Sequence, residues 1–233
     1  MFKVVVFDAY GTLFDVYSIA ALADTLYPRQ GAAIAALWRD KQIEYTRLIA
    51  LSDPCKEGGS RHYQSFWDIT QAALGYTLER LALGRSAAHE QALMDQYAEL
   101  KAFPECSAVL RRLREQGMAT AILSNGNPAM LESALASAGL AGMLDQVISV
   151  DSVRTFKTSP ASYALVGTGF GVQADEVLFV SSNAWDALGA TWFGFCTLWL
   201  NRQNLPFEAI GPRPHAVGTD LAAVFGVLAG SRE

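Results

Sequence analysis

Short apolar segments open the chain and recur, between longer amphipathic ones, after residue 98. They are rich in β-branched residues and too short for typical helices, so each predicts a buried strand. They lie at residues 3–7, 118–124, 145–150, 176–181 and 195–200. Segments with apolar residues at helical spacing lie at 104–117, 127–139, 159–171 and 184–194. This alternation predicts an α/β fold, with a Rossmann-like parallel-sheet core and helices on both faces.

Residues 15–98 interrupt the alternation. They contain no convincing strand and four segments of helical pattern, at 18–27, 32–51, 63–78 and 87–100. We therefore predict two domains, a core of residues 1–14 and 99–233 and a helical cap domain of residues 15–98. Inserted after the first strand, the cap would lie over the carboxyl ends of the parallel strands.

The composition excludes several classes of protein. Hydrophobic residues make up 51% of the chain and charged residues 18%, enough apolar surface for a large core. The net charge of -5 and the scattered basic residues predict no nucleic-acid surface. No apolar stretch reaches the roughly 20 residues that span a membrane, and no signal peptide is recognisable. The widely spaced Cys55, Cys106 and Cys196 indicate reduced thiols and a cytoplasmic protein.

Polar side chains follow four of the predicted strands. They are Asp8; Ser124 and Asn125; Asp151 and Lys157; and Ser181, Ser182, Asn183 and Asp186. Ligands of open parallel sheets bind beyond the carboxyl ends of the strands, so we expect these side chains to line one crevice. Asp8 ends a wholly apolar strand, where an uncompensated carboxylate is costly unless it is used. This favours a nucleophile at Asp8 over a strand-end cap.

Four motifs carry a resemblance to a known family. They are FDAYGTLFD (7–15), LWRDKQIEY (37–45), LSNG (123–126) and SSNAWDA (181–187). With them the chain resembles the haloacid dehalogenase superfamily and, within it, the (S)-2-haloacid dehalogenases. The resemblance implies hydrolysis of short (S)-2-haloalkanoic acids to (R)-2-hydroxy acids and halide, with inversion, through an ester on Asp8. It also implies a small-molecule substrate, no metal or organic cofactor, and a homodimer.

Two substitutions separate the chain from the phosphatases of the same superfamily, whose motifs are DxDxT and GDxxxD. Tyr10 stands where phosphatases carry a second aspartate, and Ser182 stands where they carry the first acid of the pair that ends at Asp186. Phosphoryl transfer needs a cation such as Mg²⁺ and an acid for the leaving group, whereas halide leaves without a proton. A carbon–halogen substrate is therefore favoured. The alternatives are a Mg²⁺-dependent small-metabolite phosphatase and a catalytically silent binding module.

The resemblance also implies roles for individual residues. Those implied in catalysis are Asp8, Thr12, Arg39, Lys157, Ser181, Asn183 and Asp186, and those implied in substrate binding are Tyr10, Phe66, Ser124, Asn125, Tyr163 and Trp185. Asp8 attacks the substrate carbon, Arg39 stabilises the departing halide, and Lys157 keeps Asp8 ionised. Asp186 deprotonates the hydrolytic water, and Ser181 and Asn183 orient both this water and Lys157.

Several of these side chains also have an ordinary structural explanation. Arg39 can be a solvated helix arginine paired with Asp40, Thr12 can simply close a turn, and the aromatic residues can be core residues. Asn127 is expected to cap the helix that follows it. After Lys157, Thr158 stands where the resembling motif has proline.

Overall fold

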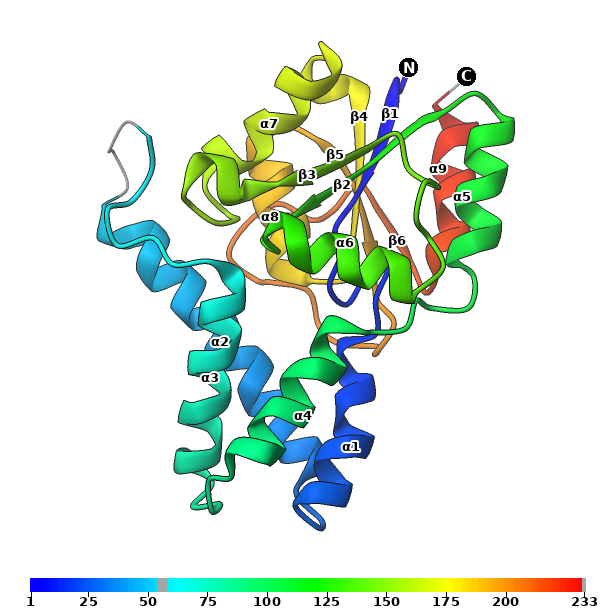
Figure 1. Ribbon diagram of the computed structural model, residues 1–233. Coiled ribbons are helices and arrows are strands. Elements are labelled where there is room, and N and C mark those ends of the chain that lie inside the picture. Colours follow the sequence, from blue (N-terminus) through cyan, green and yellow to red (C-terminus); the bar gives the residue numbers. More distant parts are fainter. Residues whose placement is uncertain (54–57, 232–233) are drawn as a thin grey trace.

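A six-stranded sheet forms the centre of the molecule (Figure 1). The computed structural model describes residues 1–53 and 58–231, so the prediction for Cys55 lies outside the described residues. The strands are β1 (Val4–Phe7), β2 (Ala119–Ser124), β3 (Gln146–Ser149), β4 (Val177–Ser181), β5 (Cys196–Leu200) and β6 (Ala216–Gly218). They lie in the order β3-β2-β1-β4-β5-β6 with every neighbouring pair parallel, which confirms the predicted α/β fold. The sequence did not predict β6.

Helices cover both faces of this sheet. They are α5 (Cys106–Glu115), α6 (Pro128–Ser137), α7 (Pro160–Phe170), α8 (Ala184–Phe193) and α9 (Val224–Gly230), with the short 3-10 helices η2 (Val150–Val153), η3 (Ala174–Glu176) and η4 (Leu221–Ala223). The path from β1 through β2 to β3 runs one way across the sheet, and the path from β3 through β4 to β5 runs the other way. Because such crossovers are right-handed, α5 and α6 lie on one face and α7 and α8 on the other.

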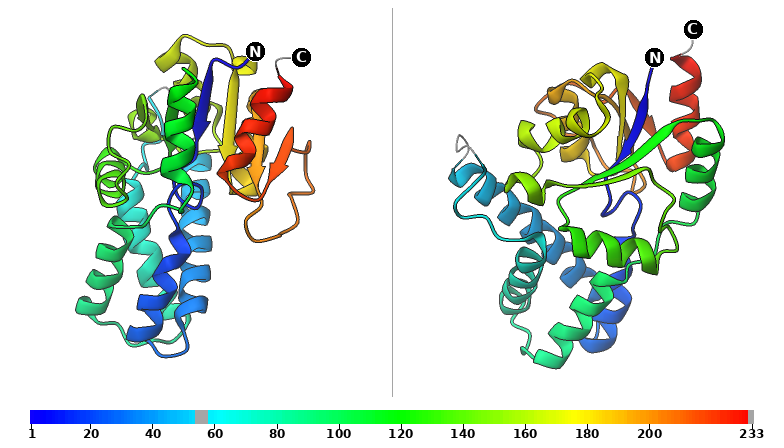
Figure 2. Two further views of the ribbon diagram at one scale, coloured as in Figure 1. Left: turned by 90° about the vertical axis from the view of Figure 1, so that its right-hand side faces the viewer. Right: turned by 45° about the horizontal axis from the view of Figure 1, so that its top comes forward.

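Four further helices form a group at one end of the sheet (Figure 2). After the short η1 (Val16–Ser18), they are α1 (Ile19–Leu26), α2 (Gly31–Ser52), α3 (Phe66–Arg80) and α4 (Ala87–Ala98). They extend from the end at which β1 terminates (Figure 1). The helices fall within or close to the predicted cap segments, while the domain boundary at residues 14 and 99 stays a prediction.

Strand β1 carries the chain into the interior of the molecule. Its four residues are fully buried, as the unbroken apolar run predicts for a strand covered on both faces. The ladder extends one residue further, because the Asp8 N–H donates to the Val180 carbonyl at 2.9 Å. The carboxylate of Asp8 is thereby fixed at the carboxyl edge of the sheet, beside the tip of β4.

Local signals set the ends of the helices near that edge. Pro128 and Pro160 begin α6 and α7, where a helix needs no N–H donor. Gly171 ends α7 in the left-handed conformation, at φ 65°. Asn127 is the residue before α6, as predicted, but its side chain makes no capping hydrogen bond.

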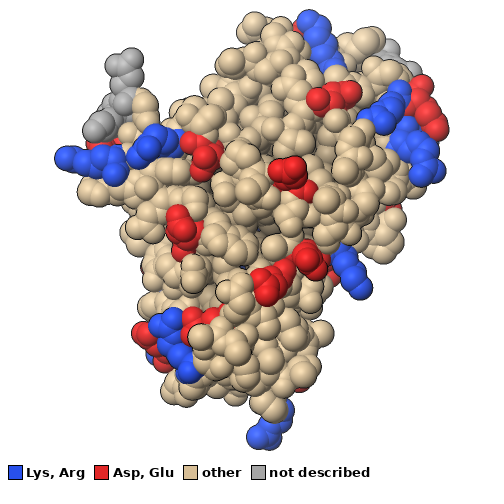
Figure 3. Space-filling model, viewed as in Figure 1, with Lys and Arg blue, Asp and Glu red and all other residues tan. Residues whose placement is uncertain are grey.

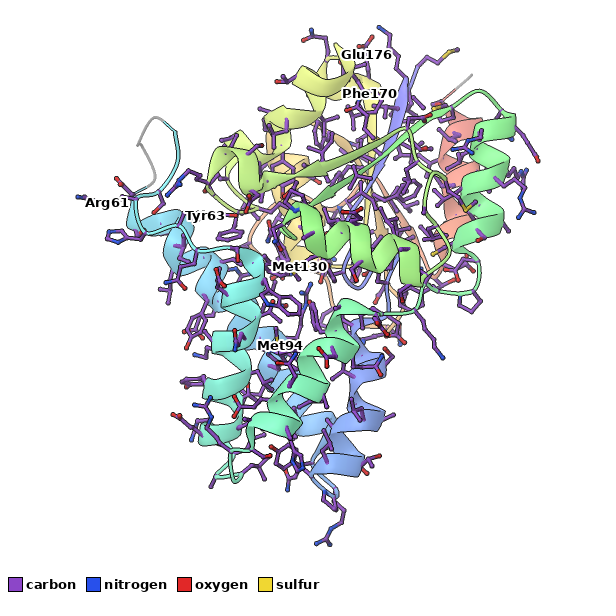
Figure 4. All side chains as sticks on the ribbon, in the orientation of Figure 1. Arg61, Tyr63, Met94, Met130, Phe170 and Glu176 are labelled. Carbon is purple, nitrogen blue, oxygen red and sulfur yellow. The ribbon has the colours of Figure 1, made fainter. Side chains whose placement is uncertain are left out.

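Charged residues of both signs share the surface. On the face shown in Figure 3, acidic side chains lie across the middle and basic side chains lie nearer the edges. None of the helices in the described ranges is both long enough and apolar enough to span a membrane. Side chains fill the region between the cap helices and the core (Figure 4), where Met94 on α4 and Met130 on α6 are both buried.

Candidate active site

The carboxylate of Asp8 is held by three hydrogen-bond donors. Its Oδ2 accepts from the Thr12 hydroxyl at 2.9 Å and from the Asn183 amide at 2.8 Å, while its Oδ1 accepts from the Lys157 ammonium at 3.0 Å. The residue is only 5% exposed. Donors on both oxygens fix the orientation of the carboxylate. Such a group is suited to attack an electrophilic carbon in a defined direction.

Lys157 lies between two carboxylates. Its ammonium is 3.0 Å from Asp8 Oδ1 and 2.9 Å from Asp186 Oδ2, and its side chain is fully buried. Burial alone would lower the pKa of Lys157, but the charges of Asp186 and Asp8 more than offset that effect and raise it. The Lys157 N–H donates to Asn125 Oδ1 at 2.9 Å, which fixes the loop even with Thr158 in place of proline.

Asp186 lies in the first turn of α8 and is completely buried. Besides the ammonium of Lys157, it is contacted by the Tyr163 hydroxyl, which donates to its Oδ1 at 2.8 Å. Burial raises the pKa of Asp186 to about 6, against the lowering effect of Lys157. A carboxylate with this pKa is a stronger base than an ordinary aspartate and is still ionised at neutral pH.

The turn after β4 points toward Asp8. The Asn183 amide donates to Asp8 Oδ2 and, at 3.0 Å, to the Tyr10 carbonyl, while the Ser181 hydroxyl accepts from the Asn183 N–H at 3.1 Å. The side chain of Asn183 reaches Asp8 because β4 is the direct neighbour of β1 and its tip lies next to Asp8. The orientation of a water molecule and of Lys157 by Asn183 stays a prediction.

Arg39 reaches the same turn from helix α2. One guanidinium nitrogen donates to the Tyr10 carbonyl and to Asn183 Oδ1, both at 3.2 Å, and the other donates to Gln42 Oε1 at 2.7 Å. Within residues 1–53 and 58–231, no carboxylate forms an ion pair with Arg39, and the alternative of a pair with Asp40 is not observed. A positive charge that no carboxylate of the described residues pairs with therefore lies beside the turn after β4.

An aromatic cluster covers the other side of Tyr10. The centre of the Tyr10 ring lies 5.9 Å from the centre of the Phe66 ring. The Tyr10 ring also stacks on the Tyr97 ring, with the two centres 5.5 Å apart and an interplanar angle of 21°. Burial raises the pKa of Tyr10 well above its ordinary value, so the phenol stays neutral. Trp185 is half-buried, and the centre of its ring lies 5.8 Å from the Arg47 guanidinium.

Two further predicted residues lie at the tip of β2. Ser124 and Asn125 are buried next to each other. The Ser124 hydroxyl accepts from the Gly126 N–H at 3.0 Å, and the side-chain Oδ1 of Asn125 accepts from the backbone N–H of Lys157. Both side chains thus brace the turns around the site, in addition to any contact with a ligand.

A cavity of about 710 Å³ opens beside the site. Arg39, Asn183 and Trp185 line it together, and Asp8, which bonds to Asn183, is not among the lining residues. The sequence had not singled out Arg47 or Arg202, which also line the cavity, nor the buried Gln42, which bonds to Arg39. The position of Gln42 one helical turn after Arg39 was the available signal.

In the described part of the chain, no three His, Cys, Asp or Glu side chains are grouped so that they could hold a metal ion. The carboxylates of Asp8 and Asp186 are instead joined through the ammonium of Lys157. The absence of a metal and of an organic cofactor stays a prediction.

The chain matches the model of one known family. The model of the haloacid dehalogenase-like hydrolases matches residues 2–194. The chain belongs to this family. The match spans β1, the cap helices and the strand tips that carry Lys157 and Asp186, so the predicted family is confirmed.

Relatives within the family are similar over almost their whole length. The (S)-2-haloacid dehalogenase of Pseudomonas sp. (strain YL) is 41% identical over 234 residues, covering 99% of this chain and 97% of that protein. The crystal structure of the L-2-haloacid dehalogenase RSc1362 is 53% identical with a TM-score of 0.94, covering 98% of this chain and 99% of that one. The Xanthobacter autotrophicus L-2-haloacid dehalogenase with chloropropionic acid covalently bound is 38% identical with a TM-score of 0.88, covering 99% of both chains.

Proposed function

We propose that the protein hydrolyses the carbon–halogen bond of short (S)-2-haloalkanoic acids and releases (R)-2-hydroxy acids and halide. One observation carries this proposal: the side chain of Asn183 joins a buried, triply hydrogen-bonded carboxylate, Asp8, to a guanidinium, Arg39, that has no carboxylate partner among the described residues. The first group is a nucleophile and the second can stabilise an anion. The covalent chloropropionic acid adduct of a relative is in line with an ester intermediate.

In the first step, an Asp8 oxygen attacks the α-carbon of the substrate from the side opposite the halogen. A carbon–oxygen bond forms as the carbon–halogen bond breaks, and the bonding electrons leave with the halide. The carbon is inverted, which converts an (S)-haloacid into an (R)-configured ester. Arg39 stabilises the departing anion, and no proton is required because halide is a stable anion.

In the second step, water attacks the acyl carbon of the Asp8 ester. Asp186 takes a proton from the water and returns it to the departing alkoxide, which becomes the hydroxy acid. The carboxyl group of Asp8 then loses its remaining proton to solvent. Lys157 lies within hydrogen-bond distance of both carboxylates and balances the charge that forms between them.

The other predicted residues support this chemistry. Thr12 and Asn183 orient Asp8, and Ser181 holds the turn that carries Asn183. Tyr163 orients Asp186. The backbone and side chains of Ser124 and Asn125 bind the substrate carboxylate, while Tyr10, Phe66 and Trp185 exclude bulk water from the α-carbon.

The test is halide release from each enantiomer of 2-chloropropionate in the presence of EDTA. We expect chloride and (R)-lactate from the (S)-enantiomer alone, and no chloride from the Asp8→Asn variant, which lacks the nucleophile. A single turnover in ¹⁸O-water should place the label first in Asp8. If the protein releases no chloride from either enantiomer but hydrolyses p-nitrophenyl phosphate with Mg²⁺ present, it is a phosphatase instead.

We also propose that the protein is a cytoplasmic homodimer, with a core of residues 1–14 and 99–233 and a cap of residues 15–98. Cys106 and Cys196 are free thiols, as expected for a reducing compartment. Apolar side chains exposed on the cap, Leu48 on α2 and Tyr76 on α3, supply a surface for a second copy.

A further inference from the structure

Gln42 is a buried amide that contacts the guanidinium of Arg39. It lies one helical turn after Arg39 on α2, is 1% exposed, and accepts a hydrogen bond from Arg39 through Oε1 at 2.7 Å. This is the shortest of the bonds described for Arg39. The orientation of the Gln42 amide therefore bears directly on where the positive charge of Arg39 lies.

The hydrogen bonds of Thr70 set that orientation. The Thr70 hydroxyl donates its single proton to the Phe66 carbonyl at 2.6 Å, one turn back on α3. Toward Gln42 it can then only accept, and it does so from Nε2 at 2.6 Å. With its nitrogen directed at Thr70, the amide must present its oxygen to Arg39, because a flipped amide would face the guanidinium with a donor.

A third helix closes the network. The Tyr97 hydroxyl on α4 accepts from Gln42 Nε2 at 3.1 Å. Its ring stacks on Tyr10, whose carbonyl is another acceptor for Arg39. Thr70, Gln42 and Tyr97 are all buried, so water cannot replace a missing partner without rearrangement.

We propose that Gln42, oriented by Thr70, is a positioning residue that directs the guanidinium of Arg39 toward the departing halide. The inference rests on the proposed dehalogenation. A neutral amide suits this role better than a carboxylate, since it fixes the guanidinium without cancelling its charge. The full positive charge of Arg39 then stays available for the halide, on which negative charge develops in the transition state.

Two matched threonine variants test the inference. Thr70 and Thr77 are both fully buried on α3, and each donates to the carbonyl four residues earlier, at 2.6 and 2.8 Å. Only Thr70 contacts Gln42. We expect Thr70→Val to lower kcat and to weaken inhibition by bromide by about 3–10-fold, the effect of one hydrogen bond, with little change in KM. Thr77→Val should leave both values within about twofold of the wild type, although it loses a comparable hydrogen bond.

A third variant addresses charge. Gln42→Glu keeps the size of the side chain but pairs Arg39 with a carboxylate, so bromide inhibition should weaken by at least about tenfold in a protein that still unfolds cooperatively. Equal kinetics for Thr70→Val and Thr77→Val, or undiminished bromide inhibition in Gln42→Glu, would overturn the inference. Wild-type halide release is measured first, since its absence would refute the proposed function rather than the role of Gln42.

Discussion

At the scale of single residues, the two central carboxylates differ because their surroundings differ. Asp8 accepts hydrogen bonds from Thr12, Asn183 and Lys157 and is oriented for attack. Asp186 is more deeply buried, and burial raises its pKa to about 6. These different surroundings support the proposed roles of Asp8 as nucleophile and Asp186 as base, although both carboxylates contact the same ammonium.

The raised pKa of Asp186 predicts a pH dependence of turnover. Only the ionised carboxylate can accept a proton from water, so kcat should fall as the pH is lowered through about 6. The Tyr163 hydroxyl stabilises that ionised form, so Tyr163→Phe should raise the pKa of Asp186 further. We expect the acid limb of the kcat profile to move up by about 0.5–1 pH unit.

A second tyrosine offers a control for that shift. Tyr63 donates to Asp151 Oδ1 at 2.7 Å, a similar tyrosine–aspartate bond outside the catalytic group. Tyr63→Phe should leave the acid limb where it is in the wild type. The role of Asp186 as base would be contradicted if the acid limb of the kcat profile did not move in Tyr163→Phe, or if it moved equally in both variants.

At the scale of elements, helix α2 reaches from the cap to the turn after β4. It supplies both Arg39 and Gln42, and its position depends on close packing against α1 where it begins at Gly31. A Cβ at Gly31 would collide with the Ala20 carbonyl oxygen and lie 2.8 Å from Asp24 Cβ. The Gly31 N–H also donates to Asp24 Oδ1 at 3.0 Å. A small residue is therefore required at this contact.

Gly31→Ala should destabilise the protein by about 1–3 kcal/mol, because α1 and α2 must separate to admit the methyl group. The measurement is the free energy of unfolding in urea. Gly226 on α9 is the matched control, since a Cβ there meets no atom within 4 Å. Gly226→Ala should instead stabilise the protein by about 0.4–1 kcal/mol, because it removes a helix-interior glycine. Equal effects of the two substitutions would contradict the close-packing argument.

The sequence predicted those elements whose pattern is local and strong. The apolar run of β1 and the strand–helix alternation after residue 98 were sufficient for the parallel sheet. Strand β6 has three residues, none fully buried, and its pairing with β5 is set by tertiary structure. In the same way, the positions of Asp8, Lys157 and Asp186 after predicted strands were sufficient to predict that they lie together. The contacts of Gln42 with Thr70 and Tyr97 depend on how three helices pack, and no short stretch of sequence encodes that.

At the scale of the whole molecule, the site lies where the cap meets the core. The segment before α3 is attached to the core through Tyr63, which stacks on Phe156 at 5.2 Å and donates to Asp151. Figure 4 shows Tyr63 in this region, between the cap helices and the core. Phe156 directly precedes Lys157 in the chain. The ring of Tyr63, which the Tyr63→Phe control retains, therefore packs beside the loop that carries the Lys157 ammonium.

The outer surface of the cap leads to the last prediction, which concerns assembly. Leu48 on α2 is 56% exposed, and one turn earlier Tyr45 meets Tyr76 of α3 edge-on at 6.4 Å. If this apolar surface joins two copies, Leu48→Asp should convert the homodimer into a monomer, because a carboxylate would be buried without a partner. Sedimentation velocity measures the change.

Ile210 provides the control, since it is 75% exposed in the loop between β5 and β6, far from α2 in the sequence. Ile210→Asp should leave the dimer intact, because the same charge is added where no partner is expected. If the dimer persists in Leu48→Asp but is lost in Ile210→Asp, the interface lies on the core and not on the cap. A wild-type monomer would refute the assembly while leaving the chemistry of Asp8 untouched, since the three donors to its carboxylate all come from its own chain.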